Sequence, residues 1–527
     1  MLEKFIQNRI LAHLPFEPNK GQAEAIEQFS QFVVSSQPRK AFILRGYAGT
    51  GKTSITAALV GAYKELKQPI VLLAPTGRAA KVLARYANMP AYTIHKCIYR
   101  ARTKVAPSLE DGSRAAYSLE AKDERREEKG ERLEARGERQ AFTLRDNLLK
   151  NALFIVDEAS MVSGERREAR GERSGIAFGS GNLLDDLVKF IYKEGNGCSL
   201  LLIGDDAQLP PVGSLDSPAL DADFMRGYGL EVSQATLTEV ARQALDSGIL
   251  ANASRVRYSL EDGASAYGLE ARGERREARG ERLEARGERT WDLLDETEDF
   301  CFISGGEVAE KLEQSYHEVG EEEVIMLTRT NKRTNIYNQG IRARILWREE
   351  ELESTDRVMV VKNNYFWTEK YEDLPFLANG DILEIRRLRN VREMYGFRFA
   401  DVQLRSVDYD WEIDAILWLD TISSDSPEAN NELHRLLFNR IAEDYPELAY
   451  SRKKLIETIY QSPYYNALQV RFAYAVTGHK AQGGQWQHVY VDAYKGGELC
   501  EEEEGFYRWL YTAITRASKK IYFIKNK

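Results

Sequence analysis

The sequence predicts an α/β fold built on parallel sheets with helices on both faces. Short apolar runs bounded by turn residues recur along the chain, as buried parallel strands require. These runs are 41–46, 70–76, 152–158, 199–205, 323–330, 488–494 and 520–526. Helix-like stretches such as 21–33 and 54–66 lie between them, and the hydrophobic content of 43% is sufficient for several cores. Alternating strands and helices indicate more than one doubly wound unit.

Residues 355–420 follow a different pattern from the rest of the chain. Four short runs here, at 357–363, 381–388, 397–405 and 411–420, are strand-like and are separated by turns instead of helices. An Asn379-Gly380 pair, which favours a tight turn, precedes the second run. We therefore expect a small antiparallel barrel inserted in the second α/β unit. Residues 426–465 return to helix-like patterning.

Composition excludes several classes of protein. The 527 residues correspond to roughly three or four domains of ordinary size. The formal net charge of −9 argues against a protein that coats nucleic acid with a bulk basic surface, although a local basic channel stays compatible with it. Four dispersed cysteines without a CxxC pair argue against a zinc site or a disulfide framework. Without a signal peptide or a long apolar run, we expect a soluble cytoplasmic protein with no membrane contact.

A charged repeat interrupts the chain three times. Residues 108–139 and 259–289 share units such as RLEARGER, and GERREARGER recurs at 164–173. The positions that a coiled coil would make apolar hold Arg, Glu or Gly, so we interpret these segments as solvated helices or disordered loops. Together they hold 40 of the 155 charged side chains, which accounts for the excess of charge in the whole chain. Their similarity suggests one DNA element inserted three times.

The first chemical motif is a phosphate-binding loop. Residues 46–53 read GYAGTGKT, between an apolar strand and a helix, and fit the pattern GxxxxGK[ST]. Glycines allow the backbone to curl so that its N–H groups point at phosphate oxygens, next to a helix N-terminus. We expect Lys52 to reach the β- and γ-phosphates and Thr53 to offer its hydroxyl to Mg²⁺. The nucleotide-binding candidates are Gly46, Gly49, Thr50, Gly51, Lys52 and Thr53.

Two further motifs follow strands and complete the expected ATP site. Asp157 and Glu158 end the run at 152–158, where Asp157 would hold Mg²⁺ and Glu158 would act as general base for the attacking water. Gln208, in IGDDAQLPPV, is placed to sense the γ-phosphate. Arg242, in LTEVARQ, and Arg516, in YTAITRAS, are candidates to stabilise the charge of the transferred phosphoryl group.

The order of these motifs resembles that of the superfamily 1B DNA helicases of the RecD-like and Dda-like type. The motifs are GYAGTGKT, APTGRAAK, TIHK, VDEAS, GDDAQLPPV, LTEVARQ, VTGHKAQGGQW and YTAITRA, and with FEPNKGQ they span nearly the whole chain. The resemblance implies two RecA-like motor domains with ATP between them. It also implies that Gln22 reads adenine, that Gln482 and Gly483 couple the γ-phosphate to the DNA grip, and that Arg242 and Arg516 come from the second motor domain.

The same resemblance assigns three loops to the groove for single-stranded DNA. Their hydroxyls, backbone amides and few cations suit a phosphate backbone without reading its base sequence. The DNA-binding candidates are Pro75, Thr76, Arg78, Thr93, His95, Lys96, Thr477, His479 and Lys480. The family also places a short β-hairpin pin between TIHK and VDEAS, where this chain has the first charged repeat. This departure puts strand separation in doubt more than ATP hydrolysis.

From the motifs we expect motor domain 1 at 1–235, with a pin-like insertion at about 97–150. Motor domain 2 is expected at 236–355 and 466–527, with the barrel and helical region at 356–465. The predicted function is an ATP-dependent DNA helicase or translocase that moves 5′→3′ in replication, recombination or repair. Its predicted cofactors are ATP and Mg²⁺. Its predicted partners are single-stranded and forked DNA, and other replication or repair proteins, with the chain itself a monomer.

Three alternatives to a DNA helicase stay open. A single-strand-dependent ATPase could translocate without efficient unwinding, and a related motor could act on RNA, since a preference for the 2′-hydroxyl is invisible in the sequence. A catalytically idle, nucleotide-gated binding module is a third possibility. The presence of Lys52, Glu158, Arg242 and Arg516 argues against this last reading.

Overall fold

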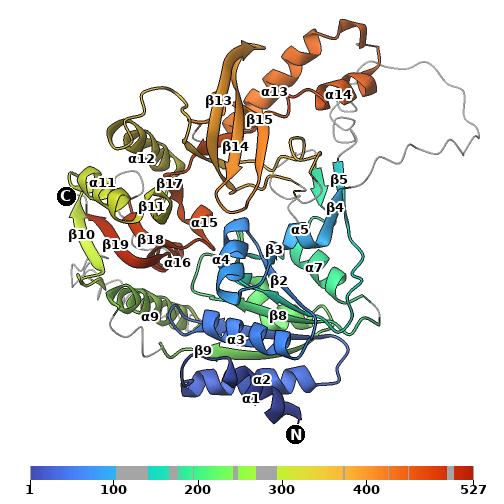
Figure 1. The fold of residues 1–527 in the computed structure, drawn as a ribbon, viewed down its shortest axis with the longest axis vertical. Helices are drawn as coiled ribbons and strands as arrows, with labels where there is room; N and C mark the ends of the chain where they lie inside the picture. Colours follow the sequence, from blue (N-terminus) through green and yellow to red (C-terminus); the bar gives the residue numbers. More distant parts are fainter. Residues whose placement is uncertain are drawn as a thin grey trace, which may run out of the picture.

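The computed structural model describes residues 2–101, 140–164, 176–178, 180–193, 195–240, 247–268, 293–371, 374, 376–424, 427–448, 450–494 and 504–525. Within these residues the chain forms two parallel sheets, a five-stranded antiparallel sheet and a small three-stranded sheet. Figure 1 shows the first parallel sheet at the bottom, the second on the left and the antiparallel sheet above both. The fold is thus α/β with two parallel sheets and an antiparallel insert.

The first parallel sheet has six strands in the order β3-β2-β6-β8-β1-β9. The strands are β1 (Lys40–Gly46), β2 (Ile70–Ala74), β3 (Ala91–Thr93), β6 (Leu153–Val156), β8 (Ser199–Gly204) and β9 (Glu231–Leu237). The helices of this unit are α1 (Leu2–Ala12), α2 (Lys20–Val34), α3 (Lys52–Glu65), α4 (Gly77–Ala87), α5 (Ile94–Ile98), α7 (Leu183–Ile191) and α8 (Ala222–Arg226). Alternate side chains of β1 enter separate apolar clusters, so both faces of the sheet are buried.

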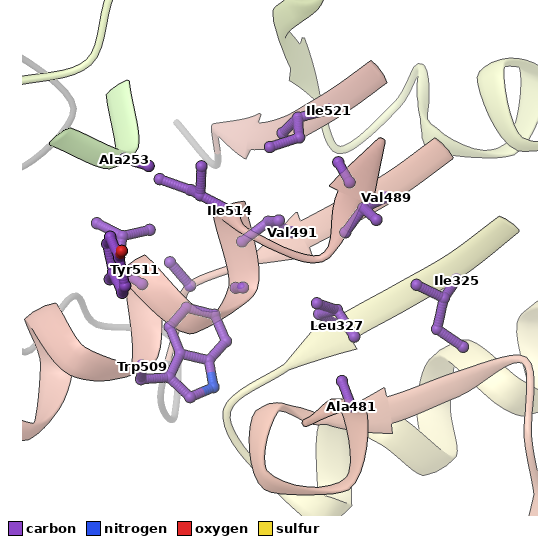
Figure 2. Packing of buried hydrophobic residues seen from close by; sticks show 14 of the residues in the cluster. Ala253, Ile325, Leu327, Ala481, Val489, Val491, Trp509, Tyr511, Ile514 and Ile521 are labelled. Carbon is purple, nitrogen blue, oxygen red and sulfur yellow. The ribbon is translucent and has the colours of Figure 1, made fainter. Parts of the chain in front are cut away.

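The second parallel sheet has five strands in the order β10-β19-β18-β11-β17. They are β10 (Phe300–Ser304), β11 (Val324–Thr328), β17 (Ala475–Thr477), β18 (Trp486–Asp492) and β19 (Ala517–Lys525). Its helices are α9 (Gly248–Gly268), α11 (Val308–Val319), α12 (Asn331–Arg344), α15 (Gly478–Ala481) and α16 (Glu504–Ile514). Figure 2 shows Ala253 of α9 beside Tyr511 and Ile514 of α16, and all three belong to one buried cluster. The two helices therefore form one packed unit.

The antiparallel sheet lies between α12 and β17 in the chain. Its strands are β12 (Arg357–Val360), β13 (Ile382–Met394), β14 (Phe397–Ser406), β15 (Glu412–Trp418) and β16 (Val470–Phe472), in the order β15-β14-β13-β12-β16. A bridge between Leu417 and Leu468 links one edge to the segment before β16, so the sheet curls toward a barrel. Helices α13 (Pro427–Glu443) and α14 (Arg452–Tyr460) follow β15, and their apolar side chains cover Phe399 and Trp418.

The small sheet pairs β4 (Tyr99–Ala101) with β5 (Gln140–Leu144), and β5 with β7 (Ile176–Phe178). Strands β4 and β5 are antiparallel and stand where the pin is expected. The first repeat, 108–139, lies outside the described residues, as does 164–173 apart from Gly164. Of the third repeat, 259–268 is the last part of α9 and the remainder is outside the described residues.

The seven predicted parallel strands all form, and the strands of the two parallel sheets that the sequence did not reveal lie at sheet edges. Strands β3 and β9 are the edges of the first sheet, and β10 and β17 are those of the second. An edge strand has one unpaired side and needs a less continuous apolar run, which is why β9, EVSQATL, alternates instead. Among the described residues, no helix has the length and apolarity needed to cross a membrane.

Candidate active site

The phosphate-binding loop connects β1 to α3 at the carboxyl edge of the first sheet. Gly49 and Gly51 adopt positive φ angles of 75° and 89°, which a side chain would disfavour. Helix α3 then begins at Lys52, so the first N–H groups of the helix face the loop. The Lys52 ammonium donates to the carbonyl oxygens of Gly46 at 2.5 Å and Tyr47 at 2.9 Å. The glycines thus form the curled backbone that the motif predicts.

Gln22 lies directly beside this loop and is buried. Its Nε2 donates to the Thr50 carbonyl at 2.9 Å, and its Oε1 accepts from the backbone N–H of Asn19 at 3.1 Å. The Asn19 side chain in turn accepts from the Gln22 backbone, which completes a capping box at the start of α2. In this structure the Gln22 amide therefore braces the phosphate-binding loop, and adenine reading stays a prediction.

The acidic pair follows β6, next to β2 in the sheet. Asp157 accepts from its neighbour's backbone N–H at 2.9 Å and from the Tyr86 hydroxyl at 2.5 Å. Burial, and then the charge of Glu158, raise the pKa of Asp157 to about 6. Glu158 adopts the left-handed conformation with φ of 50°, which is uncommon for a residue with a side chain. Tyr86, on α4, is a contact that the sequence did not reveal.

These residues have the donor chemistry of a magnesium site. Thr53, at the start of α3, and Asp157 supply oxygen atoms, which are the ligands that Mg²⁺ prefers. Asp157 and Glu158 are adjacent carboxylates, and burial raises the pKa of Asp157. A divalent cation beside them would stabilise their ionised forms. The residues therefore fit the predicted metal.

The loop after β8 is hydrogen-bonded to side chains of the second unit. Gln482 of the second unit donates through Nε2 to the Leu209 carbonyl at 2.5 Å, and the Leu209 N–H donates to the Thr512 hydroxyl at 2.9 Å. Gln208 is buried, and within the described residues its Oε1 has no hydrogen-bond partner. Such an orphaned amide oxygen is costly unless a ligand or water pairs with it.

Gly483 brings the backbone of the second unit close to α4. Its φ is 72°, and a Cβ at this position would lie 2.6 Å from the Cβ of Ala79. Only glycine fits there. Gln482 and Gly483 are thus neighbours in sequence that touch two different parts of the first unit, namely the loop after β8 and the start of α4.

Arg516 places a positive charge from the second unit at the acidic pair. Its guanidinium lies 3.5 Å from the Glu158 carboxylate, and its other donors reach the Thr512 and Gly484 carbonyls and the Thr515 hydroxyl. Arg516 is only 4% exposed, so this pairing takes place largely away from water. Arg242, the second predicted arginine, lies outside the described residues.

Tyr511 is another residue of α16 that the motifs did not single out. Its hydroxyl donates to Asp205 Oδ2 at 2.6 Å and accepts from the Ala48 N–H, in the phosphate-binding loop, at 2.9 Å. Burial, and then the charge of Asp205, raise the pKa of Tyr511 far above its usual value. One phenol therefore joins both units and two loops of the first.

The predicted DNA loops lie at the carboxyl edges of β2, β3 and β17. Thr76 and Thr93 cap α4 and α5, accepting from the N–H groups of Ala79 at 3.2 Å and Lys96 at 3.1 Å. Because β2 and β3 are paired, these two loops, with Pro75, share one edge. Thr477 precedes the short helix α15 in the second unit. The Thr76 and Thr93 hydroxyls are therefore used as helix caps, whereas the Thr477 side chain makes no capping hydrogen bond to α15.

The cations of this edge contact protein groups. The Arg78 guanidinium stacks 4.1 Å from the Trp486 ring centroid and donates to the Gln485 carbonyl. Lys480 donates to the Asn379 side chain, and the Lys96 ammonium lies over the Tyr92 ring. His479 is exposed. Arg78 thus links the first unit to the second, and Lys480 links the second unit to the antiparallel insert.

The turn between β14 and β15 also reaches the start of α4. Lys81 donates to the Val407 carbonyl and lies 3.7 Å from the Asp408 carboxylate, and the Tyr409 hydroxyl donates to the Gly77 carbonyl at 3.2 Å. A second contact with the insert is made at α5, where the His95 ring packs against Tyr99 and against Phe376 of the insert. The insert thus touches two of the predicted DNA loops.

Two segments of the chain match models of known protein families. Residues 17–170 match the family model of the AAA domain, and residues 472–524 match that of the UvrD-like helicase C-terminal domain. The first match contains the phosphate-binding loop and the acidic pair, and the second contains Gln482 and Arg516. The chain is a P-loop ATPase of the helicase type, which confirms the resemblance to superfamily 1 helicases.

Relatives of similar length are distant in sequence. An uncharacterized protein of Acanthamoeba polyphaga mimivirus is 24% identical over 553 residues, covering 93% of this chain and 96% of the relative. A structure of Pif1 helicase from Bacteroides with ADP-AlF3 and ssDNA covers 96% of this chain and 92% of its own, at 14% identity and a TM-score of 0.37. Pif1 helicase from Candida albicans covers 97% and 95%, at 13% identity and a TM-score of 0.34. Because these TM-scores are below 0.5, the fold assignment rests on the sheets described above.

Proposed function

We propose that this protein is an ATP-driven motor that moves 5′→3′ on single-stranded DNA and opens forked duplexes. The observation that carries the proposal is the pairing of Arg516 in the second unit with Glu158 in the first, at 3.5 Å. An arginine that reaches the catalytic glutamate across a domain boundary makes hydrolysis depend on domain closure. The polarity follows from the resemblance of the motif set to superfamily 1B.

In the proposed cycle, ATP binds the curled loop with its phosphates against Lys52. Closure of the cleft brings Arg516 to the γ-phosphate, where it stabilises charge on the equatorial oxygens. Glu158 takes the proton of the attacking water, and Gln208 senses the γ-phosphate. Mg²⁺, held by Thr53 and Asp157, would neutralise charge on the β- and γ-phosphates when bound. Phosphate release then reopens the cleft.

We assign the two motor domains to residues 1–235 and to 236–355 with 466–527, and the insert to 356–465. Strand β9 runs to Leu237, so the first sheet extends slightly beyond this boundary. DNA would lie across the carboxyl edges of β2, β3 and β17, where the two domains grip it alternately. Gln482 and Gly483, which touch the loop after β8 and α4, would link the two events.

The test is ATP hydrolysis and unwinding measured together on forks with a 5′ or a 3′ single-stranded tail. We expect single-stranded DNA to stimulate hydrolysis and only the 5′-tailed fork to open, with both activities lost in Lys52→Ala. Equal ATP turnover by Lys52→Ala and wild type would refute the motor. A preference for the 3′ tail would refute the polarity, and stimulation by RNA alone would move the substrate to RNA.

A second candidate is a translocase that hydrolyses ATP on single strands without opening duplexes. The observation that favours it is the short extent of the paired strands β4 and β5, which stand at the expected position of the pin. In the same assay this candidate requires DNA-stimulated hydrolysis with neither fork opened.

A further inference from the structure

Arg257, on α9, makes several charged contacts with the first unit, and none of the motifs includes it. Its guanidinium lies 2.5 Å from Asp205 Oδ1 and 2.7 Å from Asp206 Oδ1, both in the loop after β8. The same guanidinium stacks 3.4 Å from the centroid of the Tyr47 ring in the phosphate-binding loop. Arg257 is 6% exposed, so a guanidinium of the second unit is buried between the phosphate-binding loop and the loop after β8 of the first unit.

Asp205 is shared between Arg257 and the phosphate-binding lysine. Its carboxylate is 1% exposed and also accepts from the Tyr511 hydroxyl at 2.6 Å and the Ala207 N–H at 3.2 Å. The Lys52 ammonium lies 3.9 Å from Oδ2, beyond hydrogen-bond distance, and donates to two loop carbonyls instead. With Arg257 in place, Asp205 has a cation in direct contact and Lys52 does not pair closely with it.

The balance would change if the Arg257 charge were lost while the two units stay packed together. A buried carboxylate without a partner is strongly unfavourable, and an opposite charge 3.9 Å away is the nearest means of compensation among the described residues. Lys52 would then be drawn toward Asp205. A lysine paired with a buried carboxylate is less available to the phosphates that it has to bind.

We propose that Arg257 is a positioning residue that keeps Lys52 available for the nucleotide by neutralising Asp205 when the two motor domains close. The inference rests on the proposed ATP-driven motor and adds a role that differs from that of Arg516. Arg516 faces Glu158 and acts at the hydrolysed phosphate, whereas Arg257 acts through Asp205 on nucleotide affinity. Closure therefore raises both affinity and rate, through two separate arginines.

The test uses the full chain and measures the KM for ATP, kcat, and the affinity for a fluorescent non-hydrolysable ATP analogue. The variants are Arg257→Met, Asp205→Asn and their combination. We expect Arg257→Met to raise KM and weaken analogue binding by about tenfold, with kcat within about threefold of wild type. Removing the unpaired carboxylate should rescue binding, so the double variant should lie within about threefold of Asp205→Asn alone.

Two controls separate this role from a structural one. Arg255→Met, on the same helix, breaks only the exposed pair with Asp295 and should leave KM unchanged. Arg257→Lys keeps a cation beside Asp205 and should keep KM within about threefold. It carries the test if Arg257→Met fails to fold, and a tenfold rise in KM in Arg257→Lys would then overturn the proposal.

The remaining outcomes are also decisive. An unchanged KM in folded Arg257→Met, or a loss of affinity that persists in the double variant, refutes the link through Asp205. If the wild type itself neither binds nor hydrolyses ATP, the proposed motor fails. If the wild type hydrolyses ATP normally and only the Arg257 variants behave unexpectedly, the motor stands and this inference alone is rejected.

Discussion

The nucleotide cleft and the predicted DNA edge use similar residues in different ways. In the cleft, arginines of the second unit meet carboxylates of the first, as when Arg516 meets the half-buried Glu158 and Arg257 meets the buried Asp205. At the DNA edge, the cations Arg78 and Lys81 contact an aromatic ring and an acidic turn of neighbouring elements. The cleft thus has the fixed charge pairs that suit one ligand geometry, whereas DNA bound at the predicted edge would have to displace protein contacts.

The largest effect that this comparison predicts is in the cleft. Arg516→Ala removes a charge that is 4% exposed and faces Glu158, so kcat should fall by about 10³-fold or more while analogue binding persists. Single-turnover ATP hydrolysis measures the change. A fall in kcat of less than tenfold would contradict the prediction, because it would mean that the Arg516 charge contributes little to ATP hydrolysis.

The next effect concerns a buried acid at the DNA edge. Asp381 accepts from the Ala378 N–H, and burial together with the charge of Asp408 raises its pKa to about 7. A carboxyl whose pKa is raised on folding stabilises the protein below its unfolded pKa of about 4, and this contribution is lost as the pH rises through 7.

Asp381→Asn mimics the protonated form and should therefore gain stability relative to wild type between pH 5 and pH 8, by roughly 2 kcal/mol. Thermal unfolding at both pH values measures the gain. If the difference in stability between the two proteins did not change with pH, Asp381 would not titrate in this range and the prediction would fail.

A smaller effect is expected in the turn that contacts α4. Asp408→Ala frees Lys81 from a carboxylate 3.7 Å away, so affinity for single-stranded DNA at low salt should rise by about two- to fivefold. Asp410→Ala, in the same turn but exposed, is the matched control and should leave affinity unchanged. Weaker binding by Asp408→Ala would indicate that the turn supports the groove instead of competing with DNA.

The smallest effect is expected from the first repeat. Deleting residues 108–139 leaves β4 and β5 in place and removes none of the residues named in the cleft or at the predicted DNA edge, so DNA-stimulated ATPase should stay within about threefold of wild type. A steady-state assay decides this directly. A loss comparable to that of Glu158→Gln, for which removal of a general base predicts about 10²–10⁴-fold, would make the repeat part of the motor.

Sequence reasoning performs well where a function lies in consecutive residues. The phosphate-binding loop is local, so its glycines and Lys52 could be placed from eight residues, and the buried central strands follow from their apolar runs. Tyr86, Arg257 and Tyr511 could not be found, because each acts on a residue at least 50 positions away and belongs to an ordinary helix. Gln22 illustrates a further limit, since its motif suggests a ligand contact while its side chain caps a helix and braces the loop.

Helix α16 and the turn after it carry Tyr511, Thr512 and Arg516. These three side chains reach the phosphate-binding loop, the loop after β8 and the acidic pair. A rigid helix cannot release one of them while keeping the other two in place. The three contacts should therefore be gained and lost together, so that the cleft opens in a single cooperative event.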